Sequence, residues 1–240
     1  ALDANTTASN NTAVGKSALS ANTTADNNTA VGVSALLVNT TGSLNTALGG
    51  DTLKANTTGA QNTAVGMYAL NANTTASLNT AVGYVSMLVN TTGSQNTAVG
   101  SYTLDANTTG TQNTAIGYDA LTANTTASYN TAVGREALKS LTTGANNTAV
   151  GRTAAMLLTT AEQTVAVGAA TLDAATTGGS YSTAIGYAAL SSITTATHNT
   201  GVGHSALANT TTGADNVAVG NGSLDNNTTG IQNVAIGRDA

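Results

Sequence analysis

Residues 96–112 read Asn-Thr-Ala-Val-Gly-Ser-Tyr-Thr-Leu-Asp-Ala-Asn-Thr-Thr-Gly-Thr-Gln, and variants of this stretch make up the rest of the chain. Its glycine, Gly100, has an equivalent in every copy. This glycine column consists of Gly15, Gly32, Gly49, Gly66, Gly83, Gly100, Gly117, Gly134, Gly151, Gly168, Gly186, Gly203, Gly220 and Gly237. The interval between successive members is seventeen, except between Gly168 and Gly186, where it is eighteen. The chain is therefore an array of about fourteen copies of one unit.

A unit of this length is too short for a helix pair or a propeller blade, and it is typical of one coil of a parallel β-solenoid. In this fold a few residues on each side of the coil form strands that pair with the coils before and after. Glycine or asparagine at the corners takes positive φ angles. We therefore predict an all-β chain that forms a single parallel β-solenoid array over residues 1–240.

The composition agrees with such a fold and excludes several classes of function. The 240 residues include 48 Thr, 45 Ala, 28 Asn and 26 Gly, but no Pro, Cys, Trp or Phe. The absence of cysteine excludes disulfides and thiolate chemistry. A net charge of −5 argues against a nucleic-acid partner or an anionic membrane surface. No apolar run approaches the roughly 20 residues of a membrane span, so we expect no membrane insertion in this segment.

The strand motif is Asn-[Thr/Val]-Ala-[Val/Ile/Leu]-Gly, in which the second and fourth residues share one face. The fourth residue is apolar in every copy, so we predict that it points inward. This predicted core column consists of Val14, Val31, Leu48, Val65, Val82, Val99, Ile116, Val133, Val150, Val167, Ile185, Val202, Val219 and Ile236. The alanine between these two positions is predicted to face away from the core. A uniformly small residue on an outer face predicts close packing there, either of another chain or within a tight turn, and we expect interchain packing.

Two further columns complete the predicted coil. A second apolar column contains Leu19, Leu36, Leu53, Leu70, Met87, Leu104, Leu121, Leu138, Leu172, Leu190, Leu207 and Leu224, with Ala155 as its one exception. Stacked asparagines are predicted to form a hydrogen-bonded ladder at Asn22, Asn39, Asn56, Asn73, Asn90, Asn107 and Asn124. Later coils replace this asparagine with Leu141, Leu158, Ala175 and Ile193, and replace the asparagine before the strand with Thr164 and Ser182. We therefore predict an irregular subregion over residues 141–198, which also contains the one-residue insertion.

The motif Asn-[Thr/Val]-Ala-[Val/Ile]-Gly-x-x-[Ala/Ser/Thr]-Leu, clearest at 216–220 and 233–237, resembles the head repeat of YadA-like trimeric autotransporter adhesins. Similar repeats occur in phage and virus fibre shafts and in large bacterial surface proteins. The resemblance covers nearly the whole chain and implies a left-handed β-roll, a homotrimer and a location at the cell surface. The coil is longer than the usual head repeat, and we expect no neck, stalk, anchor or signal peptide within this segment. Both ends fall within the repeat, so we expect a segment of a longer array.

Catalysis needs a cluster of polar groups that does not repeat, and the sequence offers none. The only histidines, His198 and His204, lie close together in the sequence, and the acidic residues are scattered. The glycine-containing stretches lack the lysine of a phosphate-binding loop. We therefore expect no enzyme activity, no catalytic or metal-binding residues and no cofactor.

Two surface features suggest binding. Tyr68, Tyr84, Tyr102 and Tyr118 follow the glycine in four consecutive coils and form a candidate surface-contact strip for sugars or another fibre. The alternative is that tyrosine is tolerated at a variable surface position. Thr-Thr pairs recur in nearly every coil and suggest ice binding. However, adjacent strand residues point to opposite faces, so only one threonine column should face outward.

These observations predict a structural or adhesive repeat segment of an extracellular fibre, either a surface adhesin or a self-assembling filament. Its partners would be identical chains and, outside the fibre, a host or matrix surface or a glycan. The thin core favours oligomerisation, because one narrow coil buries little apolar area against its ordering entropy. The alternatives are a glycan- or ice-binding solenoid module and a phage tail-fibre shaft.

Overall fold

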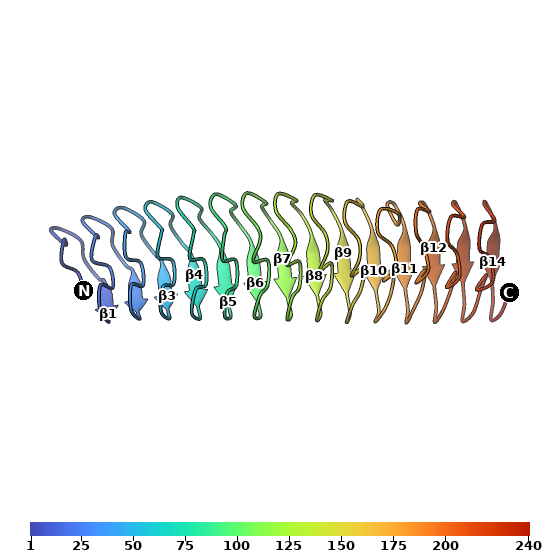
Figure 1. The fold of residues 1–240 in the computed structure, drawn as a ribbon, viewed down its shortest axis with the longest axis horizontal. Coiled ribbons are helices and arrows are strands. Elements are labelled where there is room, and N and C mark those ends of the chain that lie inside the picture. Colours follow the sequence, from blue (N-terminus) through green and yellow to red (C-terminus); the bar gives the residue numbers. More distant parts are fainter. The chain divides into compact units, whose positions relative to one another are not determined.

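The computed structural model describes residues 1–240 as two compact units, Ala1–Ile116 and Gly117–Ala240, with strands and no helices. Each coil contributes one three-residue strand (Figure 1). The first unit contains β1 (Thr12–Val14), β2 (Thr29–Val31), β3 (Thr46–Leu48), β4 (Thr63–Val65), β5 (Thr80–Val82), β6 (Thr97–Val99) and β7 (Thr114–Ile116). The second contains β8 (Thr131–Val133), β9 (Thr148–Val150), β10 (Val165–Val167), β11 (Thr183–Ile185), β12 (Thr200–Val202), β13 (Val217–Val219) and β14 (Val234–Ile236). The strands are parallel and follow sequence order, which confirms the predicted all-β parallel solenoid.

Neighbouring strands pair in register, so that equivalent residues of successive coils stack in columns. In the β5–β6 pair, for example, Thr80 lies opposite Thr97. The backbone joins the coils in both directions. Thr29 N donates to Asn45 O at 2.9 Å, and Gly32 N donates to Val14 O at 2.8 Å. Each coil is therefore held mainly by its two neighbours, as in other solenoid folds.

Alanine, rather than valine, lines the inner face of the strands. Ala30, the middle residue of β2, is fully buried, whereas Val31 is 37% exposed and Val14 is 57% exposed. The predictions that the valine column points inward and that the alanines face outward are therefore wrong. None of the members of that column is buried: Val14, Val31, Leu48, Val65, Val82, Val99, Ile116, Val133, Val150, Val167, Ile185, Val202, Val219 and Ile236. The outward alanine face, from which we expected interchain packing, does not exist.

The second apolar column explains this inversion. Its leucines are buried as predicted, with Leu36 and Leu70 fully inaccessible, except for Leu224, which is half-buried. In β12 glycine replaces the alanine, and a Cβ built on Gly201 would lie 3.3 Å from Leu190 Cγ. Leucine thus fills the interior facing the strand and leaves space for little more than a methyl group. The outer positions hold threonine as well as valine, and burying a threonine hydroxyl in every coil would require a partner for each one.

The turns depend on left-handed backbone conformations. All fourteen members of the glycine column have φ between +123° and +142°, which confirms the predicted corner role. Other residues also adopt positive φ: in one coil these are Tyr68 at 63°, Leu70 at 50° and Leu78 at 64°. Such angles are uncommon for residues with a side chain. Packing between coils must therefore impose them, because the residue types do not favour them.

The region 141–198 keeps its sheet intact despite the insertion. The extra residue is absorbed in a turn, where Gly179 has φ +88° and its N donates to Ala196 O at 2.7 Å. Strands β10 and β11 stay in register, with Val165 opposite Thr183. The residues that replace the ladder asparagine are all fully buried: Leu141, Leu158, Ala175 and Ile193. The irregularity therefore lies in one turn and in the composition of the interior.

Candidate functional site

The structure contains no pocket and no group of three or more His, Asp or Glu side chains placed to hold a metal ion. It also has no helix with the length and hydropathy that crossing a membrane requires. The chemically distinctive side chains form columns along the coils. They comprise buried asparagine ladders, an outer face of threonine and valine, rows of aromatic rings and one charged cluster.

The predicted asparagine ladder is present in the first unit, from Asn22 to Asn107. Asn56 Nδ2 donates to Asn39 Oδ1 at 2.8 Å, and Asn73 Nδ2 donates to Asn56 Oδ1 at 2.8 Å. Each amide also caps its own turn, as when Asn56 Nδ2 donates to Gly59 O at 2.9 Å. These side chains are fully buried, so the hydrogen bonds satisfy amides that would otherwise destabilise the interior.

A second ladder involves the asparagine that precedes each strand. Its side-chain oxygen accepts from the backbone of the next coil, as when Asn62 N donates to Asn45 Oδ1 at 3.0 Å. In the second unit hydroxyl groups take over part of this role. Thr164 Oγ1 donates to a backbone carbonyl one coil further on at 2.9 Å, and Asn199 N donates to Ser182 Oγ at 3.1 Å. These two substitutions therefore preserve some of the hydrogen bonding between coils.

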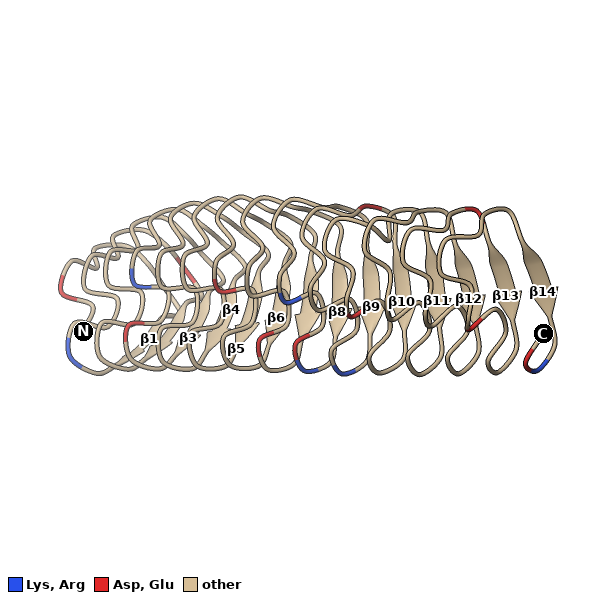
Figure 2. Cartoon of the chain, turned by 45° about the vertical axis from the view of Figure 1, so that its right-hand side comes forward, with Lys and Arg blue, Asp and Glu red and all other residues tan.

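The outward residues of the strands form what we name the Thr/Val face, made of the first and third residue of every strand. No strand contains a charged residue, and Figure 2 shows the charges on the connecting loops. In the first unit Val31, Leu48 and Val99 are each 37% exposed. Val150 and Ile185 are similarly exposed in the second unit. Each unit thus presents an uncharged face with a regular apolar column.

The Thr-Thr pairs lie elsewhere on the coil and divide into two roles. Thr40 Oγ1 donates to Thr57 O, and Thr57 Oγ1 donates to Thr74 O, both at 3.1 Å. The second threonine of each pair, such as Thr58, is exposed. One threonine column therefore ties the coils together and one faces solvent, as predicted.

The predicted tyrosine strip is continuous over three members in the first unit. Tyr68 and Tyr84 have ring centroids 6.3 Å apart with planes at 63°, and Tyr84 and Tyr102 are 5.5 Å apart at 86°. Tyr118 belongs to the second unit and is exposed. These edge-to-face contacts stabilise the stack of coils. Because the rings are turned against one another, they do not form one flat platform for a sugar.

Each histidine stacks on a tyrosine of the preceding coil. His198 lies 4.9 Å from Tyr181 with planes at 14°, and His204 lies 5.3 Å from Tyr187 with planes at 21°. These two pairs are not among the contacts predicted from the sequence. The signal was available, since the members of both pairs are separated by one repeat length.

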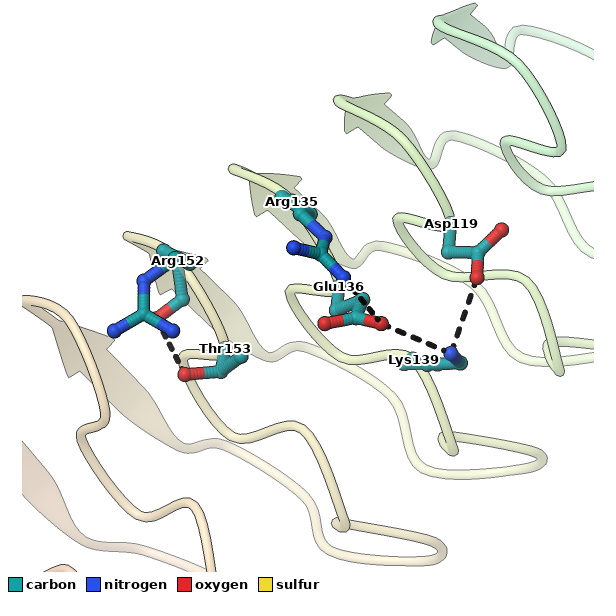
Figure 3. Close-up of polar contacts among 6 residues, drawn as sticks. All are labelled: Asp119, Arg135, Glu136, Lys139, Arg152 and Thr153. Atoms are coloured by element: carbon teal, nitrogen blue, oxygen red, sulfur yellow. Dashed lines mark hydrogen bonds and ion pairs between the residues drawn. The ribbon is translucent and has the colours of Figure 1, made fainter.

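A charged cluster, also missed from the sequence, joins two coils of the second unit (Figure 3). Lys139 Nζ lies 3.0 Å from Asp119 Oδ2 and 3.1 Å from Glu136 Oε1. Arg135 Nη2 approaches the same Glu136 oxygen at 3.5 Å. The hydrogen bond from Lys139 lowers the pKa of Glu136, and the hydrogen bond to Asp119 raises the pKa of Lys139. Arg152 occupies the equivalent of the Arg135 position one coil further on.

No known protein family and no curated protein matches this chain. The resemblance to adhesin head repeats therefore remains a prediction from the strand motif.

Proposed function

We propose that this chain is a structural and adhesive segment of an extracellular fibre, in which identical chains assemble through the Thr/Val face. The observation that carries the proposal is the regular exposure of Val, Leu and Ile on an uncharged sheet face. Contiguous exposed apolar surface of this kind marks interaction sites in soluble proteins. The interchain contact thus shifts from the expected alanine face to the valine face. The segment has no catalytic role in this proposal.

The repeat makes this contact additive along the chain. Burying the remaining third of a valine side chain contributes roughly 0.5–1 kcal/mol. Summed over the seven strands of the first unit, burial of this column alone contributes roughly 4 kcal/mol or more. A longer array would assemble more tightly without any new kind of contact. The resemblance in the strand motif favours three chains.

The internal hydrogen bonds suit a mechanical role. Backbone ladders and the asparagine ladders run between coils, so a pull along a unit loads many hydrogen bonds in series. Small residues at the strand positions keep the coil thin. A surface adhesin, a filament and a phage tail-fibre shaft would all use a segment with these properties.

Analytical ultracentrifugation of two matched variants tests the assembly. Val31→Lys with Val99→Lys places two charges on the Thr/Val face. Thr41→Lys with Thr109→Lys places the same charges on exposed residues elsewhere on the chain. We expect the wild type and the threonine variant to sediment as trimers, and the valine variant to sediment as a folded monomer with an unchanged circular dichroism spectrum.

Two results would refute the proposal. One is a wild type that stays monomeric at high micromolar concentration. The other is dissociation of both variants to the same extent, which would show that added charge matters and its position does not.

A second candidate function is binding of ice by the same face. The first and third residues of each strand point outward: the first is threonine or valine and the third is aliphatic, as in Thr97 and Val99. The face therefore has two regular columns. The Thr-Thr pairs supply only one exposed column. A thermal hysteresis measurement on the wild type and on the monomeric valine variant tests this function. No activity in the wild type would eliminate it.

A further inference from the structure

The turn after each strand of the second unit carries a column of basic, aromatic and amide side chains, which we name the corner column. Its members directly follow the glycine column: Tyr118, Arg135, Arg152, Ala169, Tyr187, His204, Asn221 and Arg238. None is acidic, and all except Ala169 are exposed. In the first unit the same position has one basic residue, Lys16, and includes exposed Val33 and Met67. The concentration of cations is therefore specific to the second unit.

Backbone hydrogen bonds fix the spacing of the corner column. Thr153 N donates to Arg135 O at 2.9 Å, and Ala170 N donates to Arg152 O at 3.1 Å. Consecutive members are thus held one coil apart, at about the 4.8 Å spacing of paired strands. Figure 3 shows Arg135 and Arg152 on equivalent turns of neighbouring coils.

The carboxylates next to this column are engaged mainly by Lys139, which lies outside the column, and Glu136 also pairs with Arg135. Lys139 contacts both Asp119 and Glu136, and each of these carboxylate side chains is only 16% exposed. Arg135 approaches Glu136 at 3.5 Å but keeps 61% of its own side chain exposed. Arg152 has no carboxylate within ion-pair distance. Lys139 and Arg135 together balance the two carboxylates, whereas Arg152 has no such partner. The guanidinium of Arg135 is still largely exposed, so Arg135 and Arg152 can both donate further hydrogen bonds to an anion from solution.

We propose that the corner column of the second unit binds an acidic polysaccharide that carries a carboxylate on each sugar. The planar guanidinium of arginine matches a carboxylate with two parallel hydrogen bonds, so Arg135 and Arg152 each take one uronate group. The coil spacing is close to the length of one sugar in an extended chain. Tyr118 and Tyr187 belong to the same column on either side of this pair, where their rings pack against the apolar faces of neighbouring sugars.

The combination of side chains favours a polysaccharide over a nucleic acid. Nucleic-acid binding draws its affinity almost entirely from many neutralised phosphates, which a chain with six basic residues and a net charge of −5 does not supply. The same net charge opposes a polyuronate, so the tyrosine contacts must contribute to its binding alongside the arginines. A polyuronate has one charge per sugar and apolar sugar faces as well, which fits a column that combines arginine with tyrosine. The inference goes beyond the proposed assembly, because every member of the column belongs to one chain.

Isothermal titration calorimetry with de-esterified polygalacturonate tests the proposal. The variant Arg135→Gln with Arg152→Gln should bind about tenfold more weakly, because each exposed charge contact contributes roughly two- to fivefold. The matched control, Lys16→Gln with Lys54→Gln, loses the same charge from the first unit and should stay within about twofold at physiological salt. Fully methyl-esterified polygalacturonate lacks the carboxylate charges and should not bind measurably to the wild type or to either double variant. Circular dichroism confirms that all variants are folded.

Four outcomes would overturn the inference. They are no binding of the wild type at low salt, equal losses in the two double variants, equal binding of the esterified polymer, and tighter binding of single-stranded DNA than of polygalacturonate. None of these depends on the oligomeric state, so a failure here is distinct from a failure of assembly through the Thr/Val face.

Discussion

Replacing Gly66 by alanine tests whether the glycine column controls the spacing between coils. Gly66 has φ +123°, and an added Cβ would lie 2.5 Å from the carbonyl oxygen of Gly83 in the next coil. Gly50 supplies a matched control in the same unit, because its φ is not in the left-handed region and an added Cβ would meet nothing within 4 Å. The two variants add the same methyl group in opposite environments.

The expected difference follows from two costs at Gly66. Holding a residue with a side chain at this φ costs roughly 1–3 kcal/mol. Relieving the overlap with the carbonyl also requires the coils to move apart, which weakens at least two hydrogen bonds between coils at about 1 kcal/mol each. We therefore expect Gly66→Ala to lower the free energy of unfolding by about 3–5 kcal/mol. Gly50→Ala should be neutral or stabilising by up to about 1 kcal/mol.

Urea unfolding followed by circular dichroism measures the two free energies, and hydrogen exchange locates the damage. Because coils contact mainly their neighbours, loss of protection in Gly66→Ala should concentrate near β4 and β5. A stability within about 0.5 kcal/mol of Gly50→Ala, with unchanged protection, would refute the steric argument.

Three further predictions concern buried and charged side chains. Asn56→Ala removes two ladder hydrogen bonds and one that caps its turn, and should lower the free energy of unfolding by about 3 kcal/mol in urea unfolding. Asn209→Ala, at an exposed position, should stay within about 0.5 kcal/mol. Burial raises the pKa of Asp173, so the protonated carboxyl contributes stability at low pH, and this contribution is lost as the pH rises through the folded-state pKa. Asp173→Asn should therefore raise the melting temperature at pH 7 and leave it unchanged at about pH 2. Lys139 lowers the pKa of Glu136. The ionised Glu136 carboxylate therefore stabilises the fold above the unfolded-state pKa, and this stabilisation is lost as the pH falls through the folded-state pKa. Glu136→Gln should therefore lower the melting temperature at pH 7 and have little effect at about pH 2, and equal effects at both values would contradict the assignment.

The repeat length predicted the coil, the glycine turns and the asparagine ladder, because spacing places identical residues of successive coils in one column. It did not predict that the ladder is buried. Which side of each strand faces the interior depends on the size of the side chains. Hydrophobicity alone predicts the opposite orientation. Val31 is more apolar than Ala30, but the buried leucines leave little room inside, since Leu190 Cγ lies only 3.3 Å from a Cβ built on Gly201. The recurring threonine on the valine side of the strand was the signal that this side faces solvent. The left-handed conformation of Leu70 has no such signal, because contacts between coils impose it.

The charged cluster was hidden for a related reason. Asp119 and Lys139 are separated by more than one repeat, and Arg135 and Arg152 by one full repeat, so they lie far apart in a linear reading. They become neighbours only when the sequence is wrapped at its repeat length. The ion pairs themselves depend on side-chain conformations, which spacing does not determine.

The asparagine ladder of the first unit also has a direction. In every step the amide nitrogen donates toward the preceding coil and the carbonyl oxygen accepts from the following coil, as Asn56 does between Asn39 and Asn73. The side-chain dipoles therefore point the same way and add along the axis, as peptide dipoles do in a helix. One end of such a stack offers donors and the other offers acceptors. Two stacks of this kind can continue each other's ladder head to tail, whereas a head-to-head junction would place donor against donor.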